Sequence, residues 1–432
     1  MMRHNPTLLT VCNGFGRLLN FALYMAVANI YGASQVTDWF FFVYAVAYFL
    51  LGICYYATES ALVPAWHQLP ENEHLPMFNS AVHLAFYAFP AVGLLLFVSG
   101  FFFAPRQGIG LPGSWLVAVA ICLVLALQPS LAFLSSFFSS YRQSKRQYVL
   151  PTMHLTLRTV GVLIVLLLIP RRSVMVLALA YLAGEVLRLG CLSYKQLPGI
   201  GSVTATTFTR KNFWSVYGHV FWMTLALMFT VINPVIDLAM VGRFPGGTVT
   251  LVEYAGRLRG MPVLALGGLL VYFLGEWSHQ HHQMNGNLQW KQVRVSFLKL
   301  VFFCLPVVVL LMMTEKIWLP LVFFSRKFGP QELHRLRQLL YWYFPGVPFL
   351  AGAMILSRAL LVVQQAKLMT FITLAAAGLN VVFNLLFIRF WGLLGVALST
   401  TLVDVFVCGM YYFFARQVLE RETRKVGAPE TG

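Results

Sequence analysis

The sequence predicts an all-α integral membrane protein with twelve transmembrane helices. Hydrophobic residues make up 59% of the chain and charged residues only 10%, whereas an ordinary soluble domain has about 25% charged residues. A helix needs about 20 apolar residues to cross the hydrocarbon of a bilayer. Twelve stretches have that length, namely residues 7–31, 39–63, 80–104, 115–139, 148–169, 174–194, 213–241, 250–275, 296–320, 336–363, 368–389 and 391–415.

Ionisable side chains inside these stretches indicate a polar path through the helix bundle. Burying one charge in hydrocarbon costs about 2.5–3.5 kcal/mol on insertion scales. Such residues are therefore kept where they face a partner or a watery cavity. They are Arg17, Glu59, Arg158, Glu185, Arg188, Asp237, Glu253, Arg257, Arg259, Lys299, Arg358 and Asp404.

The two halves of the chain repeat each other. Val36-Thr37 corresponds to Val249-Thr250, and residues 176–186 align with 395–405, which places Glu185 over Asp404. Two matches in the same order predict a six-helix unit used twice, with both copies in one orientation around a central cavity. We expect an N-lobe of helices 1–6 in residues 1–198, a linker in 199–212, a C-lobe of helices 7–12 in 213–418 and a basic cytoplasmic tail in 419–432.

The net charge of +17 points to anionic membrane lipids and an anionic substrate as partners. No basic folded domain is present to bind nucleic acid. Lys and Arg are more frequent in the expected inner loops, so the positive-inside rule favours a cytoplasmic location for both termini. Acidic residues are spread singly, and no phosphate loop or Ser/His/Asp arrangement is found. The sequence therefore predicts a protein that is not an enzyme.

Residues 246–262, GGTVTLVEYAGRLRGMP, resemble the signature of the MurJ/MviN lipid II flippases of the multidrug/oligosaccharidyl-lipid/polysaccharide (MOP) exporter superfamily. Further similar segments occur in the same order, at residues 15–21, 31–33, 37–41, 61–64, Pro151 and 392–398. The resemblance implies a flippase that moves a polyprenyl-pyrophosphate-linked saccharide precursor across the bacterial inner membrane by alternating access.

The chain departs from the family at several charged positions. The family's Arg-Asp pair in the first span is Leu23-Tyr24 here, and its Arg-Arg and Glu in the second span fall on apolar residues 50–52 and on Tyr55-Tyr56. The Asp before the family's arginine in span eight is Gly256. Family members also have further spans after the last one here. We therefore favour a cell-envelope or exopolysaccharide saccharide over lipid II as the substrate.

The resemblance assigns Arg17 and Arg257 to two arginines of the family's cavity. A guanidinium holds pyrophosphate through paired, charge-assisted hydrogen bonds and stays protonated when partly buried. Arg257 has an alternative partner in Glu253, which lies four residues earlier on the same helical face. Both interpretations stay open at this point.

Other charged residues have simpler expected roles. Arg158 and Arg358 either extend a basic substrate-binding lining or pair between the lobes, the candidate partners being Glu185, Asp237 and Asp404. Arg259 and Lys299 are expected near span ends with their charged groups at the membrane interface. Arg188 is expected to pair with Glu185, three residues away. Three histidines in the loop 276–283 have poor metal-ligand spacing and are interpreted as a solvated loop; they are His279, His281 and His282.

A second polar group forms a candidate sodium site. Asn380 and Asn384 lie one helical turn apart, and the hard oxygen ligands of the set suit an alkali cation. By resemblance to some family members, the full set is Asp237, Asn380, Asn384, Thr400 and the carbonyl of Val396, with Asn384 in place of an acid. The alternative is an interhelical hydrogen-bond cluster. In that case a proton on Asp237 or the membrane potential would supply the coupling.

Three other functions remain as alternatives. They are a lipid II flippase proper, a cation-coupled drug exporter of the same superfamily, and a non-transporting scaffold for envelope-synthesis proteins. The basic interior argues against the drug exporter, whereas the missing charges leave room for the scaffold.

Overall fold

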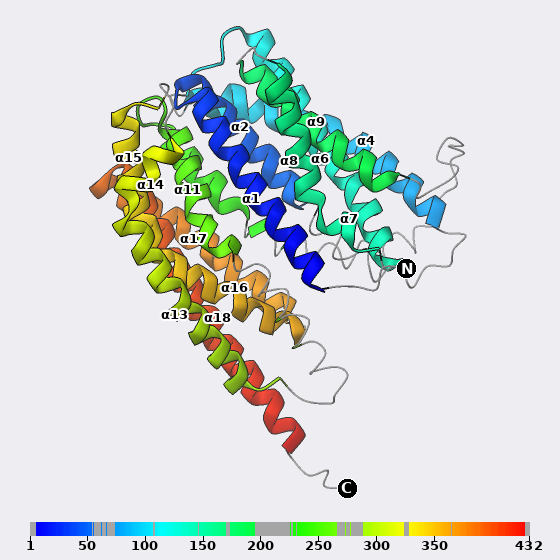
Figure 1. The fold of residues 1–432 in the computed structure, drawn as a ribbon, viewed down its shortest axis with the longest axis vertical. Helices are drawn as coiled ribbons and strands as arrows, with labels where there is room; N and C mark the ends of the chain where they lie inside the picture. Colours follow the sequence, from blue (N-terminus) through cyan, green and yellow to red (C-terminus); the bar gives the residue numbers. More distant parts are fainter. Residues whose placement is uncertain are drawn as a thin grey trace. The chain divides into compact units, whose positions relative to one another are not determined.

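The computed structural model describes residues 6–53, 55, 62, 66, 74–106, 109–145, 147–169, 173–194, 225, 228–229, 231–265, 273, 277, 288–323, 328–363 and 365–427. These residues form helices joined by short turns, without a β-strand among them (Figure 1). The chain divides into two compact units. Unit 1 comprises Met1–Glu253 with Phe324–Gly329, and unit 2 comprises Tyr254–Phe323 with Pro330–Gly432.

Unit 1 is a bundle of apolar helices. In chain order they are α1 (Pro6–Tyr31), α2 (Gln35–Gly52), α4 (His74–Val98), η3 (Ser99–Phe103), α5 (Ala104–Arg106), α6 (Trp115–Ser144), α7 (Val149–Thr152), α8 (His154–Leu168), α9 (Val174–Ser193), a helix at Val231–Val241 and the start of α11 (Thr248–Ala265). The hydroxyls of Ser34, Ser114 and Ser173 cap the N-termini of α2, α6 and α9. Each cap accepts a hydrogen bond from an amide that the helix leaves unpaired.

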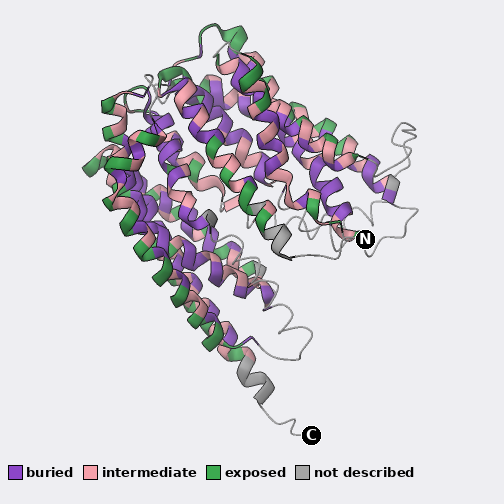
Figure 2. Cartoon of the chain, in the orientation of Figure 1, coloured by how far each residue is buried: buried purple, intermediate pink, exposed green. Residues whose placement is uncertain are grey.

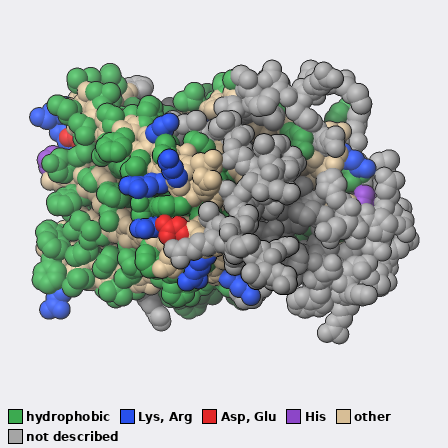
Figure 3. Space-filling view, turned by 90° about the horizontal axis from the view of Figure 1, so that it is seen from below, with side chains coloured by type: hydrophobic (Ala, Val, Ile, Leu, Met, Phe, Trp, Pro, Cys, Tyr) green, Lys and Arg blue, Asp and Glu red, His purple; other side chains and the backbone are tan. Residues whose placement is uncertain are grey.

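Unit 2 contains the rest of α11 and the remaining helices, which are α13 (Trp290–Met313), α14 (Glu315–Val322), α15 (Pro330–Tyr343), η4 (Phe344–Gly346), α16 (Val347–Val362), α17 (Ala366–Trp391) and α18 (Leu393–Gly427). α18 packs against both α16 and α17. Exposed residues recur along α13 (Figure 2), and they include the apolar Phe302, Phe303 and Met313. In the part of Figure 3 that is drawn in colour, hydrophobic side chains predominate and Lys and Arg side chains lie among them. Such surfaces suit a lipid environment.

Eight helices in the described part are long and apolar enough to cross a membrane. Described helices overlap every expected span, although the one at Val231–Val241 is short. The expectation of one span over residues 296–320 is wrong at its far end, because α13 ends at Met313 and α14 is a separate helix. The full count of twelve stays a prediction, as do the two six-helix lobes. The expected linker 199–212 lies outside the described residues.

Glycines allow α8 and α9 to pack unusually closely. A Cβ on Gly161 would lie 2.7 Å from the Cα of Gly184, and a Cβ on Gly184 would lie 2.5 Å from the carbonyl oxygen of Arg158. Small residues permit this kind of close backbone approach between membrane helices. The contact brings Arg158 on α8 beside Glu185 on α9.

We expect Gly184→Ala to destabilise the protein, because the added methyl has no room at the α8–α9 contact. Overpacking of this kind costs about 1–3 kcal/mol. The matched control is Gly190→Ala on the same helix, where nothing lies within 4 Å of an added Cβ. Fluorescence-monitored thermal unfolding in detergent compares the two variants. If the Gly184→Ala protein unfolded at the same temperature as the wild type, the contact would tolerate a side chain.

Candidate functional site

A buried cluster of charges lies where α8 and α9 cross in unit 1. Arg158 Nε is 2.6 Å from Glu185 Oε1, and Arg188 pairs with the other oxygen of the same carboxylate. Arg158 also donates a hydrogen bond of 2.7 Å to the hydroxyl of Tyr44. The three charged side chains are at most 5% exposed. The predicted pairing of Glu185 with Arg188 is confirmed. Of the three acidic residues expected as partners of Arg158, Glu185 is the one that pairs with it.

Aromatic rings surround this charge cluster. The guanidinium of Arg188 lies 4.5 Å from the centre of the Tyr55 ring, and that of Arg158 lies 5.5 Å from the ring of Tyr181. The electron-rich face of an aromatic ring attracts a cation and replaces part of its lost hydration. Tyr55 is also stacked on His154, with ring centres 4.6 Å apart. The aromatic faces therefore help two guanidinium groups to remain buried.

Arg17 lies close to the same region. The ring of His154 is within electrostatic range of Arg188, Arg158 and Arg17. α1 packs against α8 next to this point, because Gly16 leaves room for Thr156. Arg17 itself is only half-buried. The structure thus brings together two predicted substrate residues, Arg17 and Arg158, and adds Arg188, for which sequence reasoning predicted only a pairing role.

A second carboxylate, Asp38 at the start of α2, binds the N-terminus of α11. Asp38 Oδ2 accepts a hydrogen bond of 2.6 Å from the amide of Gly247, and Oδ1 accepts bonds from the amide and hydroxyl of Thr250 at 2.8 and 2.7 Å. The hydroxyl of Thr250 lies 3.0 Å from that of Thr37. Sequence reasoning did not assign a role to Asp38. The signal that could have pointed to this contact was the sequence match between Thr37, next to Asp38, and Thr250, which binds Asp38.

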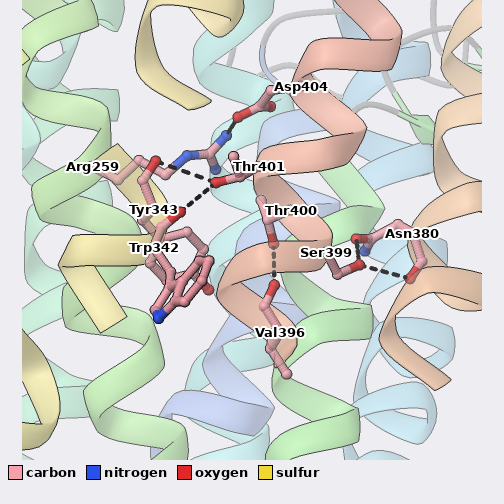
Figure 4. Close-up of polar contacts among 9 residues, drawn as sticks. All are labelled: Arg259, Trp342, Tyr343, Asn380, Val396, Ser399, Thr400, Thr401 and Asp404. Carbon is pink, nitrogen blue, oxygen red and sulfur yellow. Dashed lines mark hydrogen bonds and ion pairs between the residues drawn. The ribbon is translucent and has the colours of Figure 1, made fainter. Parts of the chain in front are cut away.

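In unit 2, Arg259 on α11 pairs with Asp404 on α18 (Figure 4). Its guanidinium also lies 5.7 Å from the centre of the Tyr343 ring. The two charged side chains are 14% and 11% exposed. The expectation that Arg259 extends to the membrane interface is therefore wrong, since a carboxylate and an aromatic face hold it inside the unit. Lys299, by contrast, is exposed.

Thr401, close to Asp404 on α18, stabilises a break between α15 and α16. Its hydroxyl donates a 2.6 Å hydrogen bond to the carbonyl of Trp342, at the end of α15 (Figure 4). A Cβ on Gly346 would lie 2.7 Å from Asp404 Oδ2, so only glycine leaves room for the carboxylate here. The sequence predicted one continuous span over this region.

The candidate sodium ligands of unit 2 lie on the facing helices α17 and α18. Asn380 and Asn384 are at most 1% exposed, and Thr400 is 9% exposed. The hydroxyl of Thr400 donates a 3.0 Å hydrogen bond to the carbonyl of Val396, and Ser399 donates one of 3.4 Å to the carbonyl of Asn380 (Figure 4). The bond from Ser399 joins α18 to α17 and fits the interhelical cluster, whereas the bond from Thr400 lies within α18. The buried oxygens also have the chemistry that an alkali cation requires.

The remaining predicted residues are placed as follows. Asp237 is buried in unit 1. Glu253 and Arg257 on α11 and Arg358 on α16 are half-buried, and their predicted roles stay predictions. The histidines of the loop 276–283 lie outside the described residues. Within the described part, no group of three or more His, Cys, Asp or Glu side chains forms a metal site.

The long apolar helices define a multi-pass membrane protein. A solved lipid II flippase MurJ in an inward closed conformation matches with a TM-score of 0.80 and 18% identity, over 94% of this chain and 87% of that chain. A multidrug resistance MATE family transporter matches with a TM-score of 0.67 and 14% identity, over 98% of this chain and 97% of that chain. These likenesses establish the fold.

The chain belongs to the lipid II flippase MurJ family, whose family model matches residues 27–427. A probable lipid II flippase MurJ from Thermotoga maritima is 22% identical over 399 residues, which cover 90% of this chain and 80% of the relative. The resemblance inferred from the sequence motifs is thereby confirmed.

We expect Asp38→Ala to destabilise the protein by about 2 kcal/mol or more, because the buried donors of Gly247 and Thr250 then have no acceptor. Thr250→Val removes a single donor and should cost less. Because both changes break the same contact, their effects should be less than additive in the double variant. Thermal unfolding in detergent measures all three. Full additivity would mean that Asp38 and Thr250 act independently.

Proposed function

We propose that this protein is a flippase that moves a polyprenyl-pyrophosphate-linked saccharide across the bacterial inner membrane. The observation that carries the proposal is the family match over residues 27–427, nearly the whole chain. The 0.80 TM-score to a solved lipid II flippase supports the same class of cargo. Transport of a finished lipid-linked precursor requires binding and reorientation of its head group rather than bond chemistry.

The arginines inside the apolar helices would capture the anionic head group. Arg17 and Arg257 are half-buried, which leaves a guanidinium able to reach a ligand. Arg158 lies in the same region as Arg17 and would extend that basic surface. Glu253 in unit 1 and Arg358 in unit 2 would add further polar contacts to the head group. Alternating access would then carry the head group across while the prenyl chain stays in lipid. The two six-helix lobes around a central cavity that the sequence predicts would suit this mechanism.

The apolar replacements favour a saccharide other than that of lipid II. Where the family carries charges, this chain has Leu23, Tyr24 and Leu51, and these side chains are 2%, 6% and 4% exposed. They pack into the core, so they offer no charged group to a head group. We therefore propose a cell-envelope or exopolysaccharide precursor as the substrate, with lipid II itself as the alternative.

Two other functions have a specific observation in their favour. The MATE likeness favours a cation-coupled drug exporter, but a cationic drug would be repelled by the buried arginines. The apolar residues at family charge positions favour a scaffold that binds envelope-synthesis proteins without transport. A scaffold would tolerate neutral residues at Arg17 and Arg257, which separates it from a flippase.

The decisive experiment is complementation in bacteria depleted of their own lipid II flippase. A lipid II flippase rescues growth, whereas a flippase for another lipid-linked saccharide is inserted in the membrane without rescue. Transport in proteoliposomes, with undecaprenyl-pyrophosphate saccharides as substrates, then identifies the cargo. We expect Arg257→Ala to reduce transport at least tenfold, because it removes charge-assisted bonds to the pyrophosphate.

The matched control is Arg416→Ala, which removes an exposed arginine of α18. It should transport like the wild type. Wild-type transport by folded Arg257→Ala would exclude the proposed role of Arg257 and favour the scaffold.

Sodium is the coupling ion that the α17–α18 cluster suits best, with Asp237 as a further ligand or as the site of a coupling proton. The resemblance places an acid at the position of Asn384, so Asn384→Asp should restore one negative charge and strengthen sodium binding about tenfold or more. Thermal stabilisation by NaCl, relative to equal choline chloride, measures the effect. An unchanged sodium response in the variant would favour the hydrogen-bond cluster with proton or potential coupling.

A further inference from the structure

The charge cluster of unit 1 contains more positive than negative charge. Arg158 and Arg188 both contact Glu185, which is the only carboxylate paired with either of them in the described part of the chain. Among the described residues, one guanidinium charge of this cluster therefore has no carboxylate of its own, and all three side chains are at most 5% exposed. An uncompensated buried charge costs several kcal/mol. Such an arrangement is expected where an anionic ligand completes the site.

Arg188 has unused hydrogen-bonding capacity. Its Nε atom is buried, and no hydrogen-bond acceptor among the described residues reaches it. A guanidinium normally uses its donors in a planar fork that matches a carboxylate or a phosphate. Glu185 Oε2 forms an ion pair with one terminal nitrogen of Arg188, and the centre of the Tyr55 ring lies 4.5 Å from the guanidinium. The Nε donor is therefore suited to an oxyanion that approaches in the plane of the guanidinium.

Arg17 is the most accessible of the three arginines near His154. Arg17 is half-buried, while Arg158 and Arg188 are buried, and all three act on the ring of His154. An anion that meets Arg17 first would find two further guanidinium groups behind it. Both are held by Glu185, whose carboxylate occupies the position between them that a phosphate group would take.

We propose that Glu185 is a built-in counter-ion that the phosphate of the substrate displaces, and that Arg188 is a substrate-binding residue together with Arg158. The inference rests on the proposed function and names the phosphate subsite of unit 1. Exchange of a carboxylate for a phosphate preserves the charge-assisted bonds of both arginines, so it requires little net energy. In the absence of substrate, Glu185 keeps the arginines together and partly neutralised.

The test is the affinity of the purified full-length protein for undecaprenyl pyrophosphate in detergent micelles. Glu185→Gln keeps the shape of the side chain and removes the competing charge, so affinity should rise about tenfold. Arg188→Lys keeps the charge but removes the fork, so affinity should fall about tenfold. The control is Glu420→Gln, which changes the net charge equally but lies in an exposed pair with Arg416. It should bind like the wild type.

A purely structural role for Glu185 predicts a different result. A folded Glu185→Gln protein with unchanged or weaker binding would overturn the inference, and so would Arg188→Lys with wild-type affinity. If Glu185→Gln does not fold, Arg188→Lys decides alone. Failure of the proposed function is distinguishable, because the wild type would then not bind undecaprenyl pyrophosphate at all. Binding that is lost in Arg257→Ala but unaffected by both cluster variants would remove only this inference.

Discussion

Carboxylates placed inside apolar helices decide which helices of this protein touch. A bilayer provides no water to solvate a buried charge, so each ionisable group requires a partner within the protein. Glu185 forms ion pairs with an arginine of α8 and one of its own helix, and Asp404 forms an ion pair with Arg259 of α11. Asp38 accepts hydrogen bonds from backbone amides at the N-terminus of α11. Each contact fixes one pair of helices.

The internal repeat explains part of this pattern. Glu185 and Asp404 are aligned by the repeat, and each serves as the acceptor for an arginine. The arginines come from different positions, which are Arg158 and Arg188 in one case and Arg259 in the other. At this aligned position the acid is the same in kind and its cationic partner differs. Thr37 and Thr250 are aligned as well, and their hydroxyl oxygens lie 3.0 Å apart. Asp38, however, faces no equivalent acid, because the residue after Thr250 is Leu251.

Local spacing made some of these features predictable. The pair of Glu185 with Arg188 follows from a separation of three residues, and the helices follow from long apolar stretches. The contact of Arg158 with Glu185 depends on the close approach at Gly161 and Gly184, which no local pattern reveals. Arg259 reaches Asp404 across 145 positions of sequence. The break at Phe344–Gly346 lies in continuously apolar sequence, so hydropathy alone cannot locate it.

The distribution of charge separates what this chain shares with its family from what is its own. Family membership accounts for the fold, and the resemblance assigns Arg17 and Arg257 to arginine positions of the family. Leu23, Tyr24 and Leu51, which depart from the family at spans one and two, are packed into the core, and the charge cluster of unit 1 is formed by α8 and α9. Arg188 lies against the ring of Tyr55, a position at which the resemblance places a family charge. Positive charge is supplied beside this position by α9. Guanidinium groups that approach from α8 and α9, among tyrosine rings, would present the head group with a differently shaped site, which is the physical argument for the proposed change of saccharide.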